Sequence, residues 1–302
     1  MANTAKKIIN RFYPPRNMLF YLQRNVLKPA SRQRISHLIA GRLQQHSPGT
    51  HGSPAANYQQ ALDREGYVML PNLLSPAQIA DVFAFIQDKK CKDRWRPQNG
   101  LFHVSQAPET CHTADYEKET LMNCPHLLEA ANNPLVLEVV SEILGCKPTI
   151  SSMNFWWSLS GHDSAEEAEN FHRDVDEWHF IKLFIYLTDV TEQSGPHVFV
   201  KGSQRESKLL PIRRYTDEEV EHAFGADRIM TFTGAAGTNF LENTFGFHKG
   251  QLPKTGNRLV FQSQYSLLPI HLYKYQPVKI DAERTRDFDP YINRLYIDHH
   301  SR

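Results

Sequence analysis

Two kinds of segment are missing from this sequence of 302 residues. No apolar run approaches the roughly 20 residues that a membrane-spanning helix needs. The four cysteines form no Cys-x-x-Cys pair, which argues against a structural zinc site or a disulfide framework and fits a reducing compartment such as the cytoplasm. The content of 40% hydrophobic and 22% charged residues is ordinary for a globular protein with a substantial core.

Acidic residues are absent before Asp63, although nine of the 34 lysines and arginines lie in that stretch. Apolar residues recur among the basic ones at helical spacing, which predicts two amphipathic helices. They are Met18, Leu19, Leu22, Val26 and Leu27 in the first helix and Ile35, Leu38, Ile39 and Leu43 in the second. Residues 46–57 are rich in Gly, Pro and Ser and predict a linker. We therefore expect residues 1–57 to form a basic arm and linker, and residues 58–302 to form the main domain.

A basic arm of this kind suggests an anionic partner. One hypothesis is that residues 1–47 associate peripherally with an anionic membrane surface, on the cytoplasmic side of the inner membrane. The alternative is that the arm packs on an acidic surface of its own domain. An organellar targeting peptide ranks below both, because Pro14-Pro15 interrupts the first amphipathic stretch. Nucleic acid is not expected as a partner, since the arginines are not regularly interleaved with aromatic residues.

The main domain changes in character at Thr149. Before it, sequence patterns predict helices at residues 58–65, 75–88 and 134–144 and a short strand at residues 66–70. After it, short β-rich runs alternate with turns, at residues 149–159, 181–190, 197–200, 237–241 and 258–265. Several such runs without long helices between them predict an all-β sandwich or barrel.

The candidate metal ligands begin with His172 and Asp174. On an extended segment their side chains point to the same face, because strand side chains repeat every second residue. With His248 they would form a face of two histidines and one carboxylate, which suits non-haem Fe(II) and leaves positions open for chemistry. Arg258 follows ten residues later and could bind a carboxylate in a bidentate fork. The chain is thus interpreted as an iron oxygenase that uses a keto-acid.

Other residues could replace members of this set. His-x-Asp alone is a common spacing, and several potential ligands lie near it: His162, Asp163, Asp176, Glu177 and His179. The third ligand also has alternatives, which are His197, His222, His271, His299 and His300. None of these alternatives is followed by an arginine placed on a strand as His248 is.

The strand expected at residues 181–190 has two different faces. Its odd positions are uniformly aliphatic, whereas its even positions include Lys182 and Phe184. The aliphatic face should pack against a helix layer or a second sheet, and the mixed face suits a pocket for a polar ligand. A buried lysine there needs an anion opposite it, unless the strand lies at an edge and the lysine reaches solvent. By the same alternation, Val260 and Gln262 share the face of Arg258.

The order of these elements resembles the phytanoyl-CoA dioxygenase family. The resemblance covers roughly residues 60–268 and rests on five stretches: Gly66 to Ser75, Phe171-His-Arg-Asp174, Phe184 to Gly195, Val200 to Ser203, and His248 to Gln262. Family members commonly have Pro-Gly-Ser-His where this chain has Lys-Gly-Ser-Gln at residues 201–204. That departure bears on the substrate rather than on the chemistry.

The resemblance implies a double-stranded β-helix of the jelly-roll or cupin type, buttressed by α-helices. It further implies that His172, Asp174 and His248 bind Fe(II) and that Arg258 binds 2-oxoglutarate. Lys182, Asn154 and Gln262 are additional candidates for contacts with this cosubstrate, and Asn154 lies with Trp156 on a strand similar to one that flanks the keto-acid in the family. For these residues core packing is an equal alternative.

The expected reaction uses O₂ and 2-oxoglutarate to hydroxylate an unactivated carbon, with release of succinate and CO₂. Related halogenases have a small residue where this chain has Asp174, so halogenation is not expected, whereas desaturation or ring closure stays open. The basic arm favours a membrane-associated lipid or lipid-linked glycan as substrate. The alternatives are a soluble acyl-CoA or small metabolite, or a catalytically silent binding protein of the same fold.

Overall fold

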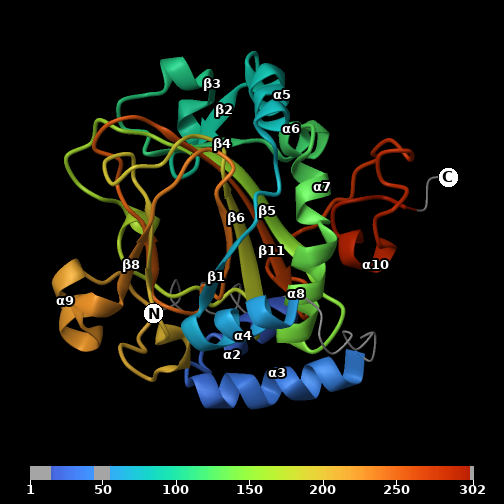
Figure 1. Cartoon of the computed structure of the whole chain (residues 1–302), viewed down its shortest axis with the longest axis vertical. Coiled ribbons are helices and arrows are strands. Elements are labelled where there is room, and N and C mark those ends of the chain that lie inside the picture. Colours follow the sequence, from blue (N-terminus) through green and yellow to red (C-terminus); the bar gives the residue numbers. More distant parts are fainter. Residues whose placement is uncertain (1–14, 44–54, 300–302) are drawn as a thin grey trace, which may run out of the picture.

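Two antiparallel sheets form the centre of the protein (Figure 1). The structure, a computed structural model, describes residues 15–43 and 55–299. Within these residues the larger sheet has eight strands, in the spatial order β1 (Tyr67–Leu70), β9 (Asn239–Glu242), β6 (Phe180–Tyr186), β11 (Arg258–Ser266), β5 (Thr149–Ser158), β4 (Thr113–Tyr116), β2 (Cys91–Asp93) and β3 (Leu101–Phe102). The smaller sheet has the order β10 (His248–Gly250), β7 (His197–Val200) and β8 (Ile229–Phe232). This architecture confirms the predicted double-stranded β-helix.

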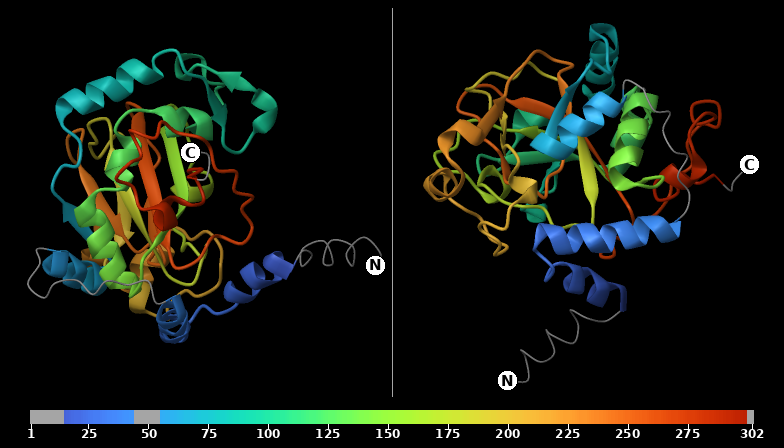
Figure 2. Two further views of the ribbon diagram at one scale, coloured as in Figure 1. Left: turned by 90° about the vertical axis from the view of Figure 1, so that its right-hand side faces the viewer. Right: turned by 60° about the horizontal axis from the view of Figure 1, so that its bottom comes forward.

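Most helices gather on one side of the larger sheet, and the smaller sheet lies on its other side together with α9 (Asp217–Phe224), which packs against β7 (Figures 1 and 2). The helices are α2 (Pro15–Gln23), α3 (Pro29–Leu43), α4 (Ala55–Glu65), α5 (Pro76–Ile86), α6 (Lys118–Asn123), α7 (Leu127–Ala131), α8 (Pro134–Leu144), α9 (Asp217–Phe224) and α10 (Pro290–Asn293). Helix α8 contacts α3, α4 and β6, so it joins the helical layer to the middle of the sheet.

The ends of the predicted helices follow from their capping residues. Ser75 caps α5, because its side chain accepts a hydrogen bond from the backbone of Gln78 and the Gln78 side chain bonds back to Ser75. Asn133 caps α8 in front of Pro134, and Gly145 ends the same helix with a positive φ of 71°. Both helices form where the sequence predicts them.

Alternation along β6 divides the interior into two cores. Ile181, Leu183 and Ile185 are buried in the core between the larger sheet and the helices. Phe184 and Tyr186 are buried in a second core between the two sheets. The prediction of an aliphatic face against helices and a mixed face toward a pocket is therefore confirmed.

Several element bounds differ from those predicted. Strand β6 ends at Tyr186 rather than Val190, and strands β2, β3, β4, β8 and β10 were not predicted. Each of these missed strands has only two to four residues, and Cys-Lys-Asp in β2 or His-Lys-Gly in β10 has no apolar alternation to mark it. They form because neighbouring strands supply partners for their backbones.

The predicted arm and linker also differ in detail. Helix α2 ends at Gln23, before Val26 and Leu27, and Lys28 could not continue it into the next helix, because a residue that precedes a proline avoids the helical region. Helix α4 begins at Ala55, inside the predicted linker, since alanines favour helix and Ala55 is buried in the core. The rest of that linker, residues 46–54, lies outside the described residues, and the boundary at residue 57 stays a prediction.

Helix α3 turns both polar and apolar residues inward. Its buried residues are Arg32, Ser36 and Ala40, and Ile39 and Leu43 of the predicted apolar face pack against the core, whereas Leu38 is 63% exposed. The described part of the arm therefore packs on its own domain, through a mixed face that includes a buried cation. None of the helices in residues 15–43 and 55–299 combines the length and the apolar character that crossing a membrane requires.

Candidate metal centre

The candidate ligands come from two chain segments that pair with each other. His172 lies in an extended segment whose backbone bonds that of His248 in both directions, at 3.0 and 3.1 Å. Two residues on, the backbone N–H of Asp174 donates to the carbonyl of Thr244 at 2.9 Å. This pairing brings the imidazole rings of the two histidines within 4.3 Å of each other, centroid to centroid.

The ligand atoms converge on one point. One atom from each of His172, Asp174 and His248 lies within 4.8 Å of the others. Nε2 of His172 is 3.6 Å from Oδ1 of Asp174, and Nε2 of His248 is 3.4 Å from Oδ2 of the same carboxylate. The Nδ1 atoms face backbone carbonyls of Asn170 and Gly246, at 2.9 and 3.0 Å. A proton on each Nδ1 leaves the Nε2 lone pairs for a metal, so the residues fit a divalent ion.

Lys182 holds the carboxylate of this set. Its Nζ lies 2.6 Å from Oδ2 of Asp174 and 3.3 Å from Oδ2 of Asp176. Burial would raise the pKa of Asp174, but the charges of Lys182 and of the two neighbouring imidazoles hold that pKa well below its ordinary value. Asp174 is therefore ionised, as a metal ligand must be. The anion that the buried lysine required is this aspartate, which favours a role in orienting Asp174 over a contact with the cosubstrate.

A cavity of about 330 Å³ lies against the candidate ligands. The sequence-predicted site residues all line it: His172, Asp174, His248, Arg258, Lys182, Asn154 and Gln262. Asn154 of β5 and Gln262 of β11 are paired in the register of the larger sheet, so their side chains share its inner face. The structure therefore brings the predicted residues into one pocket, while their individual roles stay predictions.

Arg258 is buried at the wall of this cavity. One terminal N–H donates to the carbonyl of Gly195 and the other donates to Oγ of Ser158 at 3.1 Å. No carboxylate of residues 15–43 or 55–299 lies within ion-pairing distance of its guanidinium. Burial lowers the pKa of Arg258, although the nearby phenol of Tyr186 and, to a smaller extent, the more distant charge of Glu169 oppose that effect. A buried cation without a counter-ion is costly, so this position calls for an anionic ligand.

The sequence matches the phytanoyl-CoA dioxygenase (PhyH) family over residues 62–251, which is more than half of the chain. The chain belongs to this family. As a phytanoyl-CoA dioxygenase family member, the protein is an Fe(II)- and 2-oxoglutarate-dependent dioxygenase, and the donor set of two imidazoles and one carboxylate fits the iron that such chemistry needs.

Solved structures share the fold at low sequence identity. HygX from Streptomyces hygroscopicus, solved with nickel, 2-oxoglutarate and hygromycin B, has a TM-score of 0.52 and 14% identity over 80% of this chain and 96% of that one. EctD from S. alaskensis with bound Fe has a TM-score of 0.52 and 20% identity over 85% of this chain and 92% of that one. Both support the double-stranded β-helix. No curated protein matches the chain in sequence.

The alternative ligands considered from the sequence do not join the set. Among the described residues, His172, Asp174 and His248 form the one group of three or more metal-binding side chains whose ligand atoms converge. His197 lines the same cavity, but its Nε2 lies 2.8 Å from a carboxylate oxygen of Glu242. His300 is outside the described residues.

The sequence did not predict that His197 and Glu242 would form a pair. Both side chains are buried, and the ring of His197 stacks on that of His248, with 5.6 Å between centroids. Burial raises the pKa of Glu242 to about 8 and lowers that of His197, so the pair adds no net charge beside the metal site at neutral pH. Alternation in β9 carries a signal for it, because Leu241 belongs to the helix-side core and its neighbours therefore face inward.

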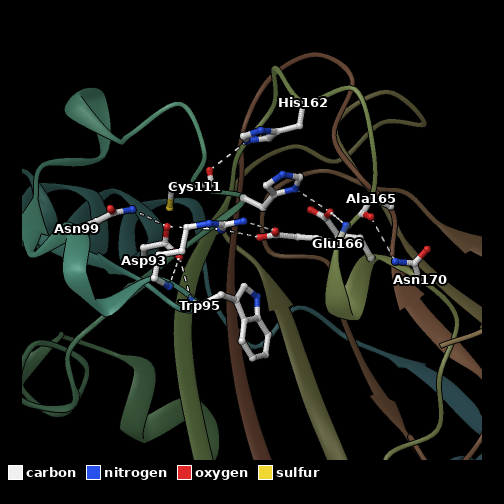
Figure 3. Close-up of polar contacts among 11 residues, drawn as sticks. Asp93, Trp95, Asn99, Cys111, His162, Ala165, Glu166 and Asn170 are labelled. Atoms are coloured by element: carbon white, nitrogen blue, oxygen red, sulfur yellow. Dashed lines mark hydrogen bonds and ion pairs between the residues drawn. The ribbon is translucent and has the colours of Figure 1, made fainter. Parts of the chain in front are cut away.

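Polar contacts fix the segment that leads into His172 (Figure 3). Arg96 makes two hydrogen bonds with Glu166, at 3.0 and 2.5 Å. Nδ1 of His112 lies 2.9 Å from Oε2 of Glu169, and the His112 ring stacks on that of His162. Because Arg96 and His112 lie in the loops that flank β2 and β4, these contacts tie the long connection after β5 back to the edge of the larger sheet.

Proposed function

We propose that the protein hydroxylates an aliphatic carbon of a small, polar molecule without net charge, with release of succinate and CO₂. The observation that carries this proposal is the pairing of charges in the cavity. Apart from Arg258, each lysine or arginine among its described lining residues has a carboxylate partner: Lys182 with Asp174 and Asp176, Arg94 with Asp115, and Arg214 with Glu167.

This pairing disfavours an acyl-CoA substrate. Phosphate groups are recognised by arginines or lysines that are free to donate to them, and Arg258 is the cation left for the keto-acid. Trp95 and Tyr273, which are 43% and 48% exposed, also line the cavity. Their flat, amphipathic side chains suit the carbon face of a polar ring or short chain.

Each residue of the site would have a separate role. A ferrous ion held by two imidazoles and a carboxylate supplies O₂ activation together with the 2-oxo acid. His172 and His248 would present Nε2 while backbone carbonyls hold their Nδ1 protons. Lys182 would keep Asp174 ionised and oriented, and Arg258 would bind the distal carboxylate of 2-oxoglutarate. The aromatic walls formed by Phe184 and Trp156 would exclude water from the reacting carbon.

The test is a substrate screen that reads two products. Succinate release and incorporation of one oxygen atom from ¹⁸O₂ are measured with four pools: neutral polyols and sugars, zwitterionic metabolites, acyl-CoAs, and lipid-linked glycans in micelles. We expect coupled turnover with a compound of the first two pools and none in the His248→Ala variant. Coupled turnover confined to acyl-CoAs or to lipids would contradict the proposal.

A lipid substrate at a membrane surface is the second candidate. It is favoured by Met18, Leu19 and Leu22 on α2, which are 43%, 48% and 52% exposed on a helix that carries basic residues nearby in the sequence. Such a surface fits an anionic bilayer. Flotation with phosphatidylglycerol vesicles tests it: replacing the three residues by serine should abolish binding, and binding that persists, or that is absent from the unaltered protein, counts against this candidate.

The catalytically silent alternative finds no support. The complete donor set converges on one point and Arg258 is left without a carboxylate partner in the described chain, which is the arrangement that metal and keto-acid binding would require. A silent relative has no reason to keep a buried cation that lacks a carboxylate partner beside that set. A weak visible charge-transfer band on anaerobic addition of 2-oxoglutarate to the Fe(II)-loaded protein separates the two cases.

A further inference from the structure

The buried face of the arm has no part in the chemistry described so far. Gln23 of α2 is 2% exposed and Arg32 of α3 is 4% exposed, although both belong to surface helices near the start of the chain. Burial lowers the pKa of Arg32 to about 10, with Glu177 opposing that effect. A buried guanidinium is retained only where hydrogen bonds compensate its lost hydration, so the partners of Arg32 indicate what it does.

Arg32 contacts the segment that follows Asp174. One terminal N–H₂ group donates to the carbonyl of Glu177 and, at 3.2 Å, to Oε1 of Gln23. The guanidinium also lies over the ring of Trp178, with 5.6 Å to the centroid. These contacts fix both the backbone and a side chain within four residues of the candidate ligand.

Gln23 makes a second contact with the same segment. Its Nε2 donates to the carbonyl of Val175, the residue directly after Asp174, at 2.6 Å. The other terminal nitrogen of Arg32 donates to the backbone carbonyl of Gln23 and to that of Val26, both at 3.1 Å. The two arm residues thus form one hydrogen-bonded unit that holds Val175 and Glu177 by their carbonyl groups.

The same unit contacts the segment that precedes the third ligand. The guanidinium of Arg32 lies 4.8 Å from the centroid of the Phe245 ring, three residues before His248. The carbonyl of Phe245 accepts a hydrogen bond from Arg173 at 2.6 Å, and that of Thr244 accepts one from Asp174. Arg32 therefore sits where the segment after Asp174 and the turn before His248 meet.

We propose that Gln23 and Arg32 are positioning residues, which hold Asp174 and His248 in register so that the arm sets the affinity of the site for metal. This inference rests on the proposed metal-binding role of those two ligands. It assigns the buried face of the arm a task that is independent of any membrane, because both residues point into the domain. The exposed apolar residues of α2 are not part of this hydrogen-bonded unit.

The test compares Arg32→Ala, Arg32→Lys and Gln23→Ala with Arg34→Ala, which removes an exposed arginine from the same helix. Binding of Mn(II) to the full chain is measured by calorimetry, at a temperature where circular dichroism shows each variant folded. We expect Arg32→Ala to raise the dissociation constant of Mn(II) about tenfold, the lower end of the usual effect of residues that orient metal ligands. Gln23→Ala should have a smaller effect and Arg34→Ala none.

The lysine variant separates positioning from simple stability. A lysine side chain would keep the charge but not the planar fork that spans Gln23 and Glu177, so Arg32→Lys should recover only part of the metal affinity. The free energy of unfolding in urea is measured alongside. A loss of stability in Arg32→Ala with an unchanged dissociation constant for Mn(II) would overturn the proposal.

A second readout works without metal or substrate. Hydrogen exchange of backbone amides, followed by mass spectrometry, should accelerate in residues 170–178 and 243–248 of the Arg32→Ala and Gln23→Ala proteins and not in Arg34→Ala. If the substrate screen fails while these effects are found, the positioning role stands and the proposed substrate class does not. Unchanged exchange in both segments would overturn the positioning role even if the oxygenase function is correct.

Discussion

Replacing Arg258 by glutamine should separate recognition of 2-oxoglutarate from the remainder of the site. The guanidinium is buried, it donates to Gly195 and Ser158, and it has no carboxylate partner among the described residues. Glutamine retains a donor for the Gly195 carbonyl, so the wall of the cavity should persist. What the variant loses is the charge and the fork that would bind the distal carboxylate.

The expected loss of affinity for 2-oxoglutarate follows from these contacts. A hydrogen bond to a charged group contributes about 1.5–3 kcal/mol, and a buried bidentate pair should lie toward the upper part of that range, at about 2–3 kcal/mol. Because 1.4 kcal/mol corresponds to a factor of ten, the variant should bind 2-oxoglutarate about 30- to 150-fold more weakly. The turnover number at saturating 2-oxoglutarate should fall much less, since Arg258 does not contact the candidate metal ligands.

The assay compares the affinities of two ligands for two proteins, the unaltered protein and Arg258→Gln. Binding of 2-oxoglutarate and of 2-oxopentanoate, which has a methyl group in place of the distal carboxylate, is measured by calorimetry on Mn(II)-loaded protein. The unaltered protein should prefer 2-oxoglutarate by the factor given above, and Arg258→Gln should lose that preference. Arg94→Gln is the control, because Arg94 lines the same cavity but is already paired with Asp115. Equal preference in the unaltered protein and Arg258→Gln would refute the reasoning.

Two further predictions concern other buried charges. Lys182→Met removes the cation that lies 2.6 Å from Asp174, so calorimetry should show Mn(II) binding about 10- to 100-fold more weakly. The control is Lys254→Met, which removes an exposed lysine and should leave the affinity unchanged. Equal Mn(II) affinities of Lys182→Met and the unaltered protein would contradict the role of Lys182. Burial raises the pKa of Glu242 from an ordinary 4.5 to about 8, so the stability contributed by its protonated form is present below about pH 4.5 and lost as the pH rises through about 8. The free energy of unfolding of Glu242→Gln, measured by urea titration without metal, should therefore rise relative to that of the unaltered protein between about pH 5 and 8. The exposed Glu192→Gln is the control and should show no such rise. A difference between Glu242→Gln and the unaltered protein that does not change with pH would contradict the raised pKa of Glu242.

The site could be predicted from the sequence where two features agree, which are the alternation of side chains along a strand and the order of the motifs. His172, Asp174 and His248 converge as expected, and the even positions of β6 face the pocket while its odd positions face the helices. Both results depend on local geometry, because a strand repeats every two residues whatever its surroundings.

Contacts between distant segments could not be predicted in the same way. The sequence leaves open whether the arm faces a membrane or packs on its own domain, and no pattern in it indicates that Arg32 is buried against a loop 145 residues away in sequence. The pair of His197 and Glu242 depends on which strand of one sheet faces which strand of the other. Such partners follow from tertiary packing, which overrides the local preference of a charged residue for the surface.

The central claim is that His172, Asp174 and His248 hold Fe(II) beside a pocket for 2-oxoglutarate. Its most direct test is the visible difference spectrum on adding 2-oxoglutarate to the Fe(II)-loaded protein without oxygen. We predict a weak charge-transfer band that saturates at one equivalent of 2-oxoglutarate and is lost in the His172→Ala and His248→Ala variants but kept in His179→Ala. Absence of the band in the folded, unaltered protein, or its persistence in the first two variants, would contradict the claim.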